Sequence, residues 1–166
     1  VFEDTQPRLA DVDGDGDNEV VVVESHQDLG ARLAIYDESG FVTATPEIGR
    51  RFRWLAPVGV ADFDGDGRPE IAYVDRPHLA KTLRMWRMED GALVQLPSFA
   101  GVTNHRIGER DIAGGIRQCD GKPAQAIVAD ATWSRVLGLA FDGGDYAVED
   151  LGPHRGRASF AQALSC

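Results

Sequence analysis

The fold is decided by two nine-residue stretches, Asp11-Val-Asp-Gly-Asp-Gly-Asp-Asn-Glu19 and Asp62-Phe-Asp-Gly-Asp-Gly-Arg-Pro-Glu70. Each stretch carries acids at positions 1, 3, 5 and 9 and glycines at positions 4 and 6. An apolar run follows each one, at 20–23 and at 71–74. Because the same loop-then-strand order occurs twice in a chain of 166 residues, it predicts a structural repeat.

The repeat continues beyond the acidic stretches. Each of the first two copies has a second apolar segment (33–36, 83–86), a turn (37–40, 89–91) and a short strand-like segment (41–44, 92–96). A third copy has apolar segments at 126–129, 136–141 and 146–148, with Asp111-Ile-Ala-Gly-Gly115 at the loop position. The tail 157–166 is similar to the strand before the second loop, so repeats are expected at about 1–46, 47–97 and 98–151, with a partial fourth at 152–166.

Short strands, glycine-rich turns and the lack of helical periodicity predict an all-β fold. The runs after the loops are apolar at consecutive positions, which indicates that both faces of each sheet are buried. Four-stranded antiparallel sheets that stack around an axis form a β-propeller. We therefore expect one domain of three propeller blades plus one extra strand, as part of a larger or oligomeric propeller.

The acidic stretches predict two calcium sites. Calcium takes six to eight hard oxygen ligands, and carboxylates at alternate positions can point inward where glycines permit a tight turn. An EF-hand would need an acid at position 12, where this chain has Val22 and Tyr73 in strand-like runs. The predicted ligands are Asp11, Asp13, Asp15, Asp17, Glu19, Asp62, Asp64, Asp66, Arg68 and Glu70, with Asp17 and Arg68 acting through their carbonyls. The alternative is a pair of acidic turns without metal.

These loops and the strands after them resemble FG-GAP/VCBS repeats, the family that builds integrin-α-type β-propellers. The resemblance is strong in the first two copies and weak in the third, where Ala113 and Gly115 stand in place of loop acids. It implies a calcium loop between the first two strands of each blade and a propeller used for binding. It also implies a secreted, periplasmic or cell-surface location.

The loops opposite the acidic stretches form a basic face in such blades. The segments 25–31, 45–53, 76–81, 97–105, 131–135 and 152–157 hold eight basic residues, two acids and all four histidines. Charge of one sign attracts oppositely charged ligands, which favours an anionic partner for this face. The candidate ligand-binding residues are Arg50, Arg51, Arg76, His78, His105 and Trp133; the alternative is that they are ordinary solvated loop residues.

Composition and motifs exclude several other classes. The formal charge of −10 argues against nucleic-acid binding, and no apolar stretch reaches the ~20 residues of a membrane span. No Gly-x-Ser-x-Gly elbow, P-loop or His-Glu-x-x-His motif is present. A zinc site from His26, His78 and His105 and a nucleophile from Ser25, His26 and Asp28 are weaker interpretations.

Two cysteines are present. Cys119 and Cys166 fall near the loop positions of neighbouring blades, which favours a disulfide between them over two free thiols.

The leading functional interpretation is a non-catalytic, calcium-binding module for a protein or glycan partner. The alternatives are an extracytoplasmic enzyme that acts on carbohydrate or anionic polymer at the basic face, and a purely structural scaffold. Three blades and a strand do not close a ring, so we expect missing N-terminal blades rather than a pair of chains or an open arc.

Overall fold

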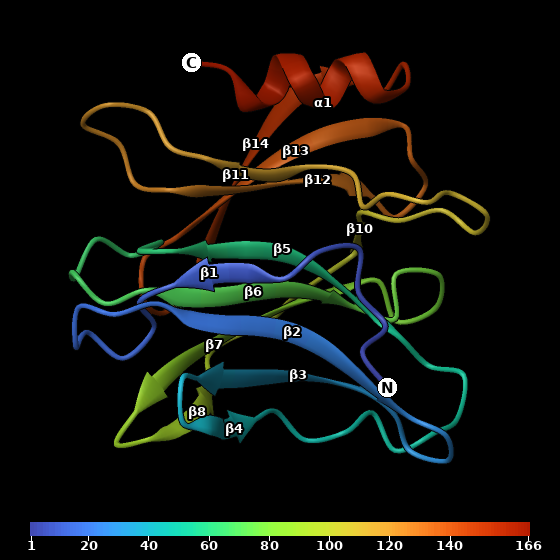
Figure 1. Cartoon of the computed structure of the whole chain (residues 1–166). Helices are drawn as coiled ribbons and strands as arrows, with labels where there is room; N and C mark the ends of the chain where they lie inside the picture. The colour runs from blue at the N-terminus through green and yellow to red at the C-terminus, as the bar shows by residue number, and fades with distance from the viewer.

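The computed structural model describes residues 1–166 and contains three antiparallel β-sheets and one short helix (Figure 1). The first sheet has the order β1 (Arg8–Ala10), β2 (Glu19–His26), β3 (Gly30–Asp37) and β4 (Gly40–Ala44). The second has the order β5 (Leu55–Ala61), β6 (Glu70–Asp75), β7 (Thr82–Glu89) and β8 (Ala92–Gln95), with β9 (Phe99–Ala100) pairing with β7. The third has the order β10 (Val102–Thr103), β12 (Gln125–Asp130), β13 (Arg135–Phe141) and β14 (Tyr146–Pro153), with β11 (Gly115–Arg117) also pairing with β12. The all-β prediction is confirmed.

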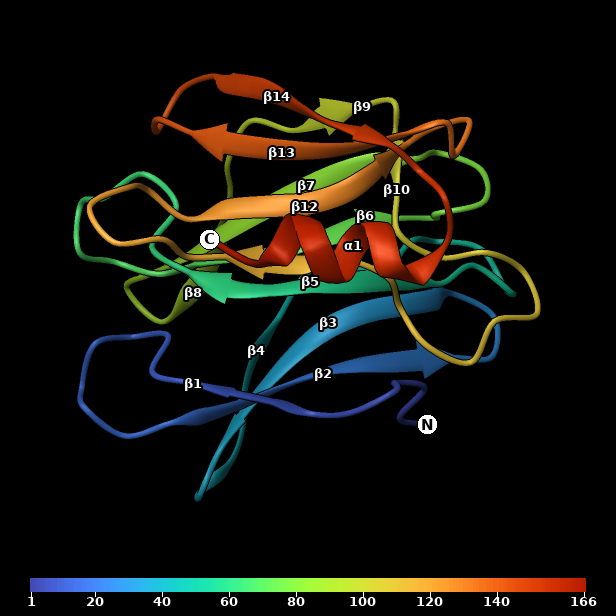
Figure 2. The same ribbon diagram turned by 90° about the horizontal axis from the view of Figure 1, so that it is seen from above.

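The sheets stack in chain order, with the second sheet in the middle (Figures 1 and 2). Val21, Leu33 and Ile35 of the first sheet pack with Tyr73 and Trp86 of the second in one buried cluster. A second cluster joins the other face of the middle sheet to the third sheet and includes Phe63, Ala72, Val74, Leu83, Met85, Ala126, Val128 and Leu139. Burial on both faces explains why β6 is apolar at consecutive positions.

One face of the first sheet has no such cover. The second sheet packs on the first through Val60, Ile71, Tyr73 and Trp86. The third sheet packs on the second through the equivalent residues Ile116, Ala126, Val128 and Leu139. The matching registers place Leu9, Val20, Val22 and Tyr36 at these positions in the first sheet. Leu9 is 67% exposed, so this face is apolar but lies against no other sheet of the chain.

The extra strand predicted for the tail is wrong, because Arg157–Leu164 forms the helix α1. Three of its eight residues are alanine and none is β-branched, which favours helix over strand. Phe160 and Ala163, three positions apart, pack against Ile127 and Val136 of the third sheet. The helix therefore lies on the outer face of the third sheet, where the next strand was expected (Figure 1).

The position predicted for the third loop is also wrong. Asp111–Gly115 leads into β11 and ends on its first residue. The pairing of β11 with β12 sets Arg117 opposite Gln125, just as Ala61 stands opposite Glu70 in the second sheet. The third loop is thus 118–124, and Gln125 takes the place of the closing acid. The extra segment 104–114 lies between β10 and β11, so the spacing from the second loop does not mark the position of the third loop.

The predicted cysteine pair is confirmed. Cys119 lies in the third loop and Cys166 lies two residues after α1, with their sulfur atoms at bonding distance and their Cα atoms 5.7 Å apart. The pair ties α1 to the loop end of the third sheet. No helix of the structure has the length and apolar character needed to cross a membrane.

Candidate metal centre

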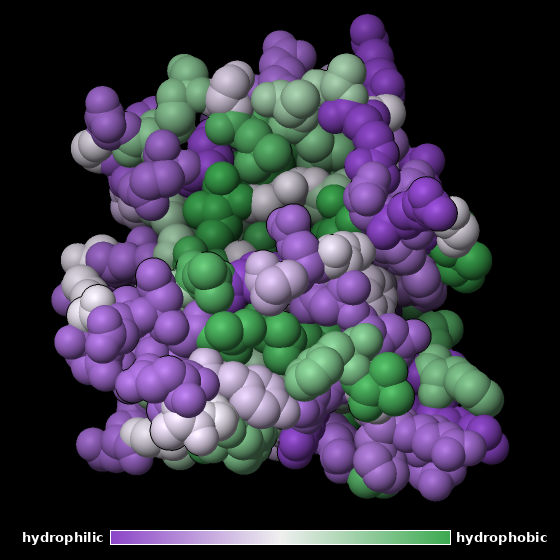
Figure 3. Space-filling model, viewed as in Figure 1, coloured by the Kyte–Doolittle hydropathy of each residue, from purple (hydrophilic) through white to green (hydrophobic).

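The two acidic loops connect the first two strands of their sheets and lie at the same end of the stack (Figure 1). Hydrophilic residues predominate at this end and at the opposite loop end, with apolar residues visible between them (Figure 3). The backbone turns at Gly14 and Gly16, with φ of 83° and 99°, and at Gly65 and Gly67, with φ of 77° and 89°. Only glycine adopts this left-handed region without strain, so the glycines allow each loop to curl.

The two loops share one hydrogen-bond pattern. We refer to Asp11–Glu19 as loop one and to Asp62–Glu70 as loop two. In loop one, the carboxylate of Asp11 accepts from the N–H groups of Gly14 (2.7 Å) and Gly16 (3.1 Å), and Asp13 accepts from Asp15 N–H (3.2 Å). Loop two repeats these bonds from Gly65 to Asp62 (2.7 Å), Gly67 to Asp62 (2.9 Å) and Asp66 to Asp64 (3.2 Å). The shared spacing of residues therefore gives the same local structure twice.

Three carboxylates converge in each loop. One oxygen from each of Asp11, Asp13 and Asp15 lies within 4.8 Å of the others, and Asp62, Asp64 and Asp66 form the equivalent group. These are hard oxygen donors on a flexible loop, which suits calcium and not a soft metal. The residues present therefore fit the ion that the sequence predicts.

The closing acids Glu19 and Glu70 lie outside these two groups and are buried. Their carboxylates accept from the N–H groups of Val12 and Phe63, each at 2.8 Å. Burial raises the pKa of both glutamates above its ordinary value, although these hydrogen bonds act in the opposite direction. Val12 and Phe63 are themselves core residues, so each closing acid connects its loop to a core cluster.

The other two predicted ligands occupy position 7. The N–H groups of Asp17 and Arg68 each donate to the position-5 carboxylate, Asp15 or Asp66, at 2.9 Å. The Arg68 guanidinium also pairs with Asp66 at 2.9 Å.

Arg87 on β7 contacts loop two, and this contact is not among those predicted from the sequence. Its guanidinium donates to Asp64 (2.7 Å), to Asp66 (3.1 Å) and to Glu70. Burial opposes its charge, but the hydrogen bonds to Asp64 and Glu70 outweigh burial and raise the pKa of Arg87 above its ordinary value. The sequence does contain a signal for this contact. Arg87 is the one charged residue in the apolar run 85–88, and the pairing of β6 with β7 places it opposite Glu70, the closing acid.

At the opposite end of the stack, the structure brings two of the predicted ligand-binding residues together. His78 Nε2 lies 3.1 Å from His105 Nδ1, and the Trp54 ring lies 5.1 Å from that of His105. Burial and the neighbouring His105 lower the pKa of His78. This pair is a candidate recognition point.

The other predicted residues lie in separate groups. Arg76 pairs with Asp75 at 2.8 Å, and Arg51 stacks on the ring of its neighbour Phe52. Trp133 packs against His154 and Phe160. The guanidinium carbon of Arg106, in the segment 104–114, lies over the Trp133 ring, 4.4 Å from its centre. Arg50 donates through its backbone N–H to Leu29. The predicted basic face, at the end of the stack opposite the acidic loops, is therefore a broad surface and not one compact site. We call it the basic end.

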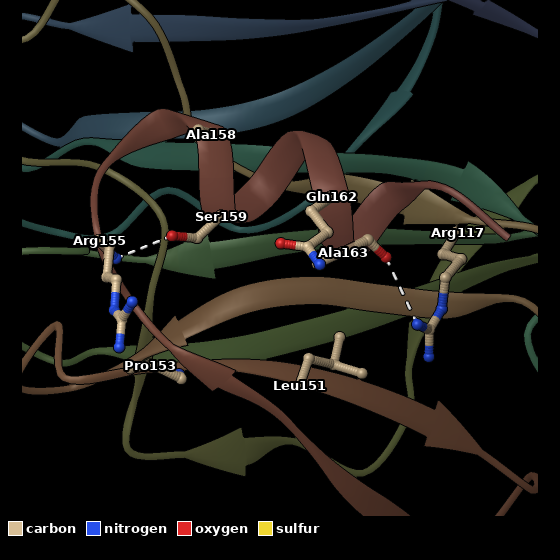
Figure 4. A pocket seen from close by; sticks show the side chains of 8 residues that line it. All are labelled: Arg117, Leu151, Pro153, Arg155, Ala158, Ser159, Gln162 and Ala163. Atoms are coloured by element: carbon tan, nitrogen blue, oxygen red, sulfur yellow. Dashed lines mark hydrogen bonds between the residues drawn. The ribbon is translucent and has the colours of Figure 1, made fainter.

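An open pocket of about 590 Å³ lies between α1 and β14 (Figure 4). Its lining residues are Arg117, Leu151, Pro153, Arg155, Ala158, Ser159, Gln162 and Ala163. Arg117 is already paired with Glu149 at 2.6 Å, and the N–H of Arg155 donates to Ser159 Oγ at 2.8 Å. The lining offers no carboxylate, histidine or cysteine, so it lacks an acid–base pair.

Residues 11–73 match the family model of the FG-GAP-like repeat. The match begins at the first acid of loop one and ends within β6, so it includes both acidic loops. Comparison with curated proteins and with solved structures gave no match.

Proposed function

We propose that this chain, which carries an FG-GAP-like repeat, is a calcium-stabilised binding module with no chemistry of its own. The observation that carries the proposal is the convergence of three carboxylates in each of two loops that share one hydrogen-bond pattern. Asp11, Asp13 and Asp15 would hold one ion, and Asp62, Asp64 and Asp66 the other. A bound calcium supplies positive charge that offsets the repulsion between these carboxylates.

The proposed architecture and location follow from the same features. The three sheets stack face to face in chain order, and we assign them as blades of a propeller-type arrangement. The cysteine pair supports a secreted, periplasmic or cell-surface location, because disulfides persist in oxidising compartments. Calcium is abundant outside the cell, which suits loops that depend on it.

Calcium is expected to raise the melting temperature of the chelator-treated protein. At a concentration ten times Kd, each filled site adds about 1.4 kcal/mol to the free energy of unfolding, because the ion binds only the folded loops. Thermal unfolding followed by circular dichroism measures the shift. The quadruple variant Asp11→Asn, Asp13→Asn, Asp62→Asn, Asp64→Asn should show none, and an unchanged wild-type melting temperature rejects the metal assignment.

The basic end is the proposed contact surface for an anionic protein or glycan. Replacing both Arg50 and Arg51, which are exposed, with glutamate should slow association with a sulfated glycan such as heparin by about tenfold at low salt. Surface plasmon resonance measures the rate. Lys122→Glu, at the acidic-loop end, is the matched control and should have little effect; equal slowing by both variants would refute the surface.

A further inference from the structure

The two acidic loops differ at one position of the strand pairing. In the second sheet, Ile71 pairs with Trp86, and the next pair is Glu70 with Arg87. In the first sheet, Val20 pairs with Tyr36, so the residue that corresponds to Arg87 is Asp37. The closing acid of loop two therefore pairs with a cation, whereas the first sheet has an acid at the position that corresponds to Arg87.

Arg87 brings its positive charge into the carboxylate group of loop two. The side chain is buried, with the residue only 6% exposed, and one guanidinium reaches Asp64 at 2.7 Å and Asp66 at 3.1 Å. These are two of the three carboxylates that converge in this loop. Arg68 adds a second positive charge to Asp66.

Loop one has no such cation. The carboxylates of Asp11, Asp13 and Asp15 accept hydrogen bonds only from backbone N–H groups of their own loop. Asp37 instead holds the next turn, where it accepts from Ser39 N–H at 2.7 Å and Gly40 N–H at 2.9 Å. Loop one thus carries five acids and no base in nine residues. Loop two carries four acids and one arginine, Arg68, and is also contacted by Arg87 from β7.

We infer that the two loops are unequal calcium sites, with loop one the high-affinity site and loop two partly neutralised by Arg87. This rests on the proposed function. Calcium in loop two must compete with a guanidinium within 4 Å of Asp64 and Asp66, where charges of like sign repel. Loop one meets no competing cation, so the ion is its only source of positive charge. Loop two keeps its shape without calcium, because Arg87 bridges Asp64, Asp66 and Glu70.

Isothermal titration with calcium chloride separates the sites. In the variant Asp11→Asn, Asp13→Asn only loop two can bind, and in Asp62→Asn, Asp64→Asn only loop one can bind. We expect loop two to bind at least about tenfold more weakly, a difference of about 1.4 kcal/mol. Equal affinities, or tighter binding by loop two, overturn the inference, and this comparison leaves Arg87 in place.

A second arm tests Arg87 itself. Arg87→Met in the loop-two-only background should tighten calcium binding by about tenfold, and calcium should stabilise this variant more than its parent. Arg84→Met is the matched control, because Arg84 lies on the same strand and pairs with Asp75 instead of a loop acid. If Arg87→Met leaves the affinity unchanged, Arg87 is not the cause and the inference fails. If neither loop binds calcium in the wild-type protein, the proposed function itself fails.

Discussion

Replacing Phe63 with alanine is expected to lower the free energy of unfolding by about 3–5 kcal/mol. Phe63 is fully buried, with 0% exposure, although it occupies the second position of an acidic loop. Its ring packs in the cluster that joins the second and third sheets, and its N–H donates to Glu70. The substitution leaves a cavity beneath loop two, so both sheet stacking and loop position should suffer. Urea unfolding followed by tryptophan fluorescence measures the loss.

Phe52→Ala is the control for Phe63. Phe52 is 80% exposed and contacts the side chain of Arg51, so its loss should change stability by no more than about 0.5 kcal/mol. A similar loss from both variants would mean that Phe63 does not support the interface between the sheets.

Removing the cysteine pair is the second large effect. The variant Cys119→Ser, Cys166→Ser should lose about 4 kcal/mol, the chain-entropy value for two residues separated by 47 positions. Only non-covalent contacts, chiefly those of Phe160, Ala163 and the partly buried Leu164, would then hold α1 on the third sheet. Chemical unfolding of the variant and of the wild-type protein measures the difference.

Reduction supplies the control for the cysteine pair. Wild-type protein treated with dithiothreitol should match the double-serine variant, and dithiothreitol should not change the variant. A loss below about 1 kcal/mol in both comparisons would show that the pair adds little to the stability of the fold.

The sheets could be predicted because local signals repeat. The Asp-Gly pattern marks where the second strand of a sheet begins, and the apolar runs at 20–23 and 71–74 indicate burial on both faces. The tail forms a helix although its apolar positions match those of the strand before loop two, because three of its eight helical residues are alanine. Helix propensity and the absence of β-branched residues were the signals that would have distinguished the two.

The parts of the candidate site that depend on distant contacts could not be predicted. Arg87 reaches loop two only because the β6–β7 pairing sets it opposite Glu70. The contact between His78 and His105 depends on how the loops 76–81 and 104–114 meet, and no local pattern specifies that path. The loop conformations, by contrast, depend on hydrogen bonds within nine residues each, so the repeated Asp-Gly pattern is enough to bring three carboxylates together in both loops.

The helix α1 gives the stack of sheets a direction. At one end the third sheet is closed by Phe160 and Ala163, and the cysteine pair fastens this closure. At the other end the first sheet still presents Leu9 and Phe41 to solvent. The outer surface at this end is formed by the exposed residues of α1, which are Arg157, Ala158, Ala161 and Gln162. Extension by a further sheet is therefore one-sided: it can proceed on the first sheet directly, but on the third only after the cysteine pair is reduced and the helix displaced.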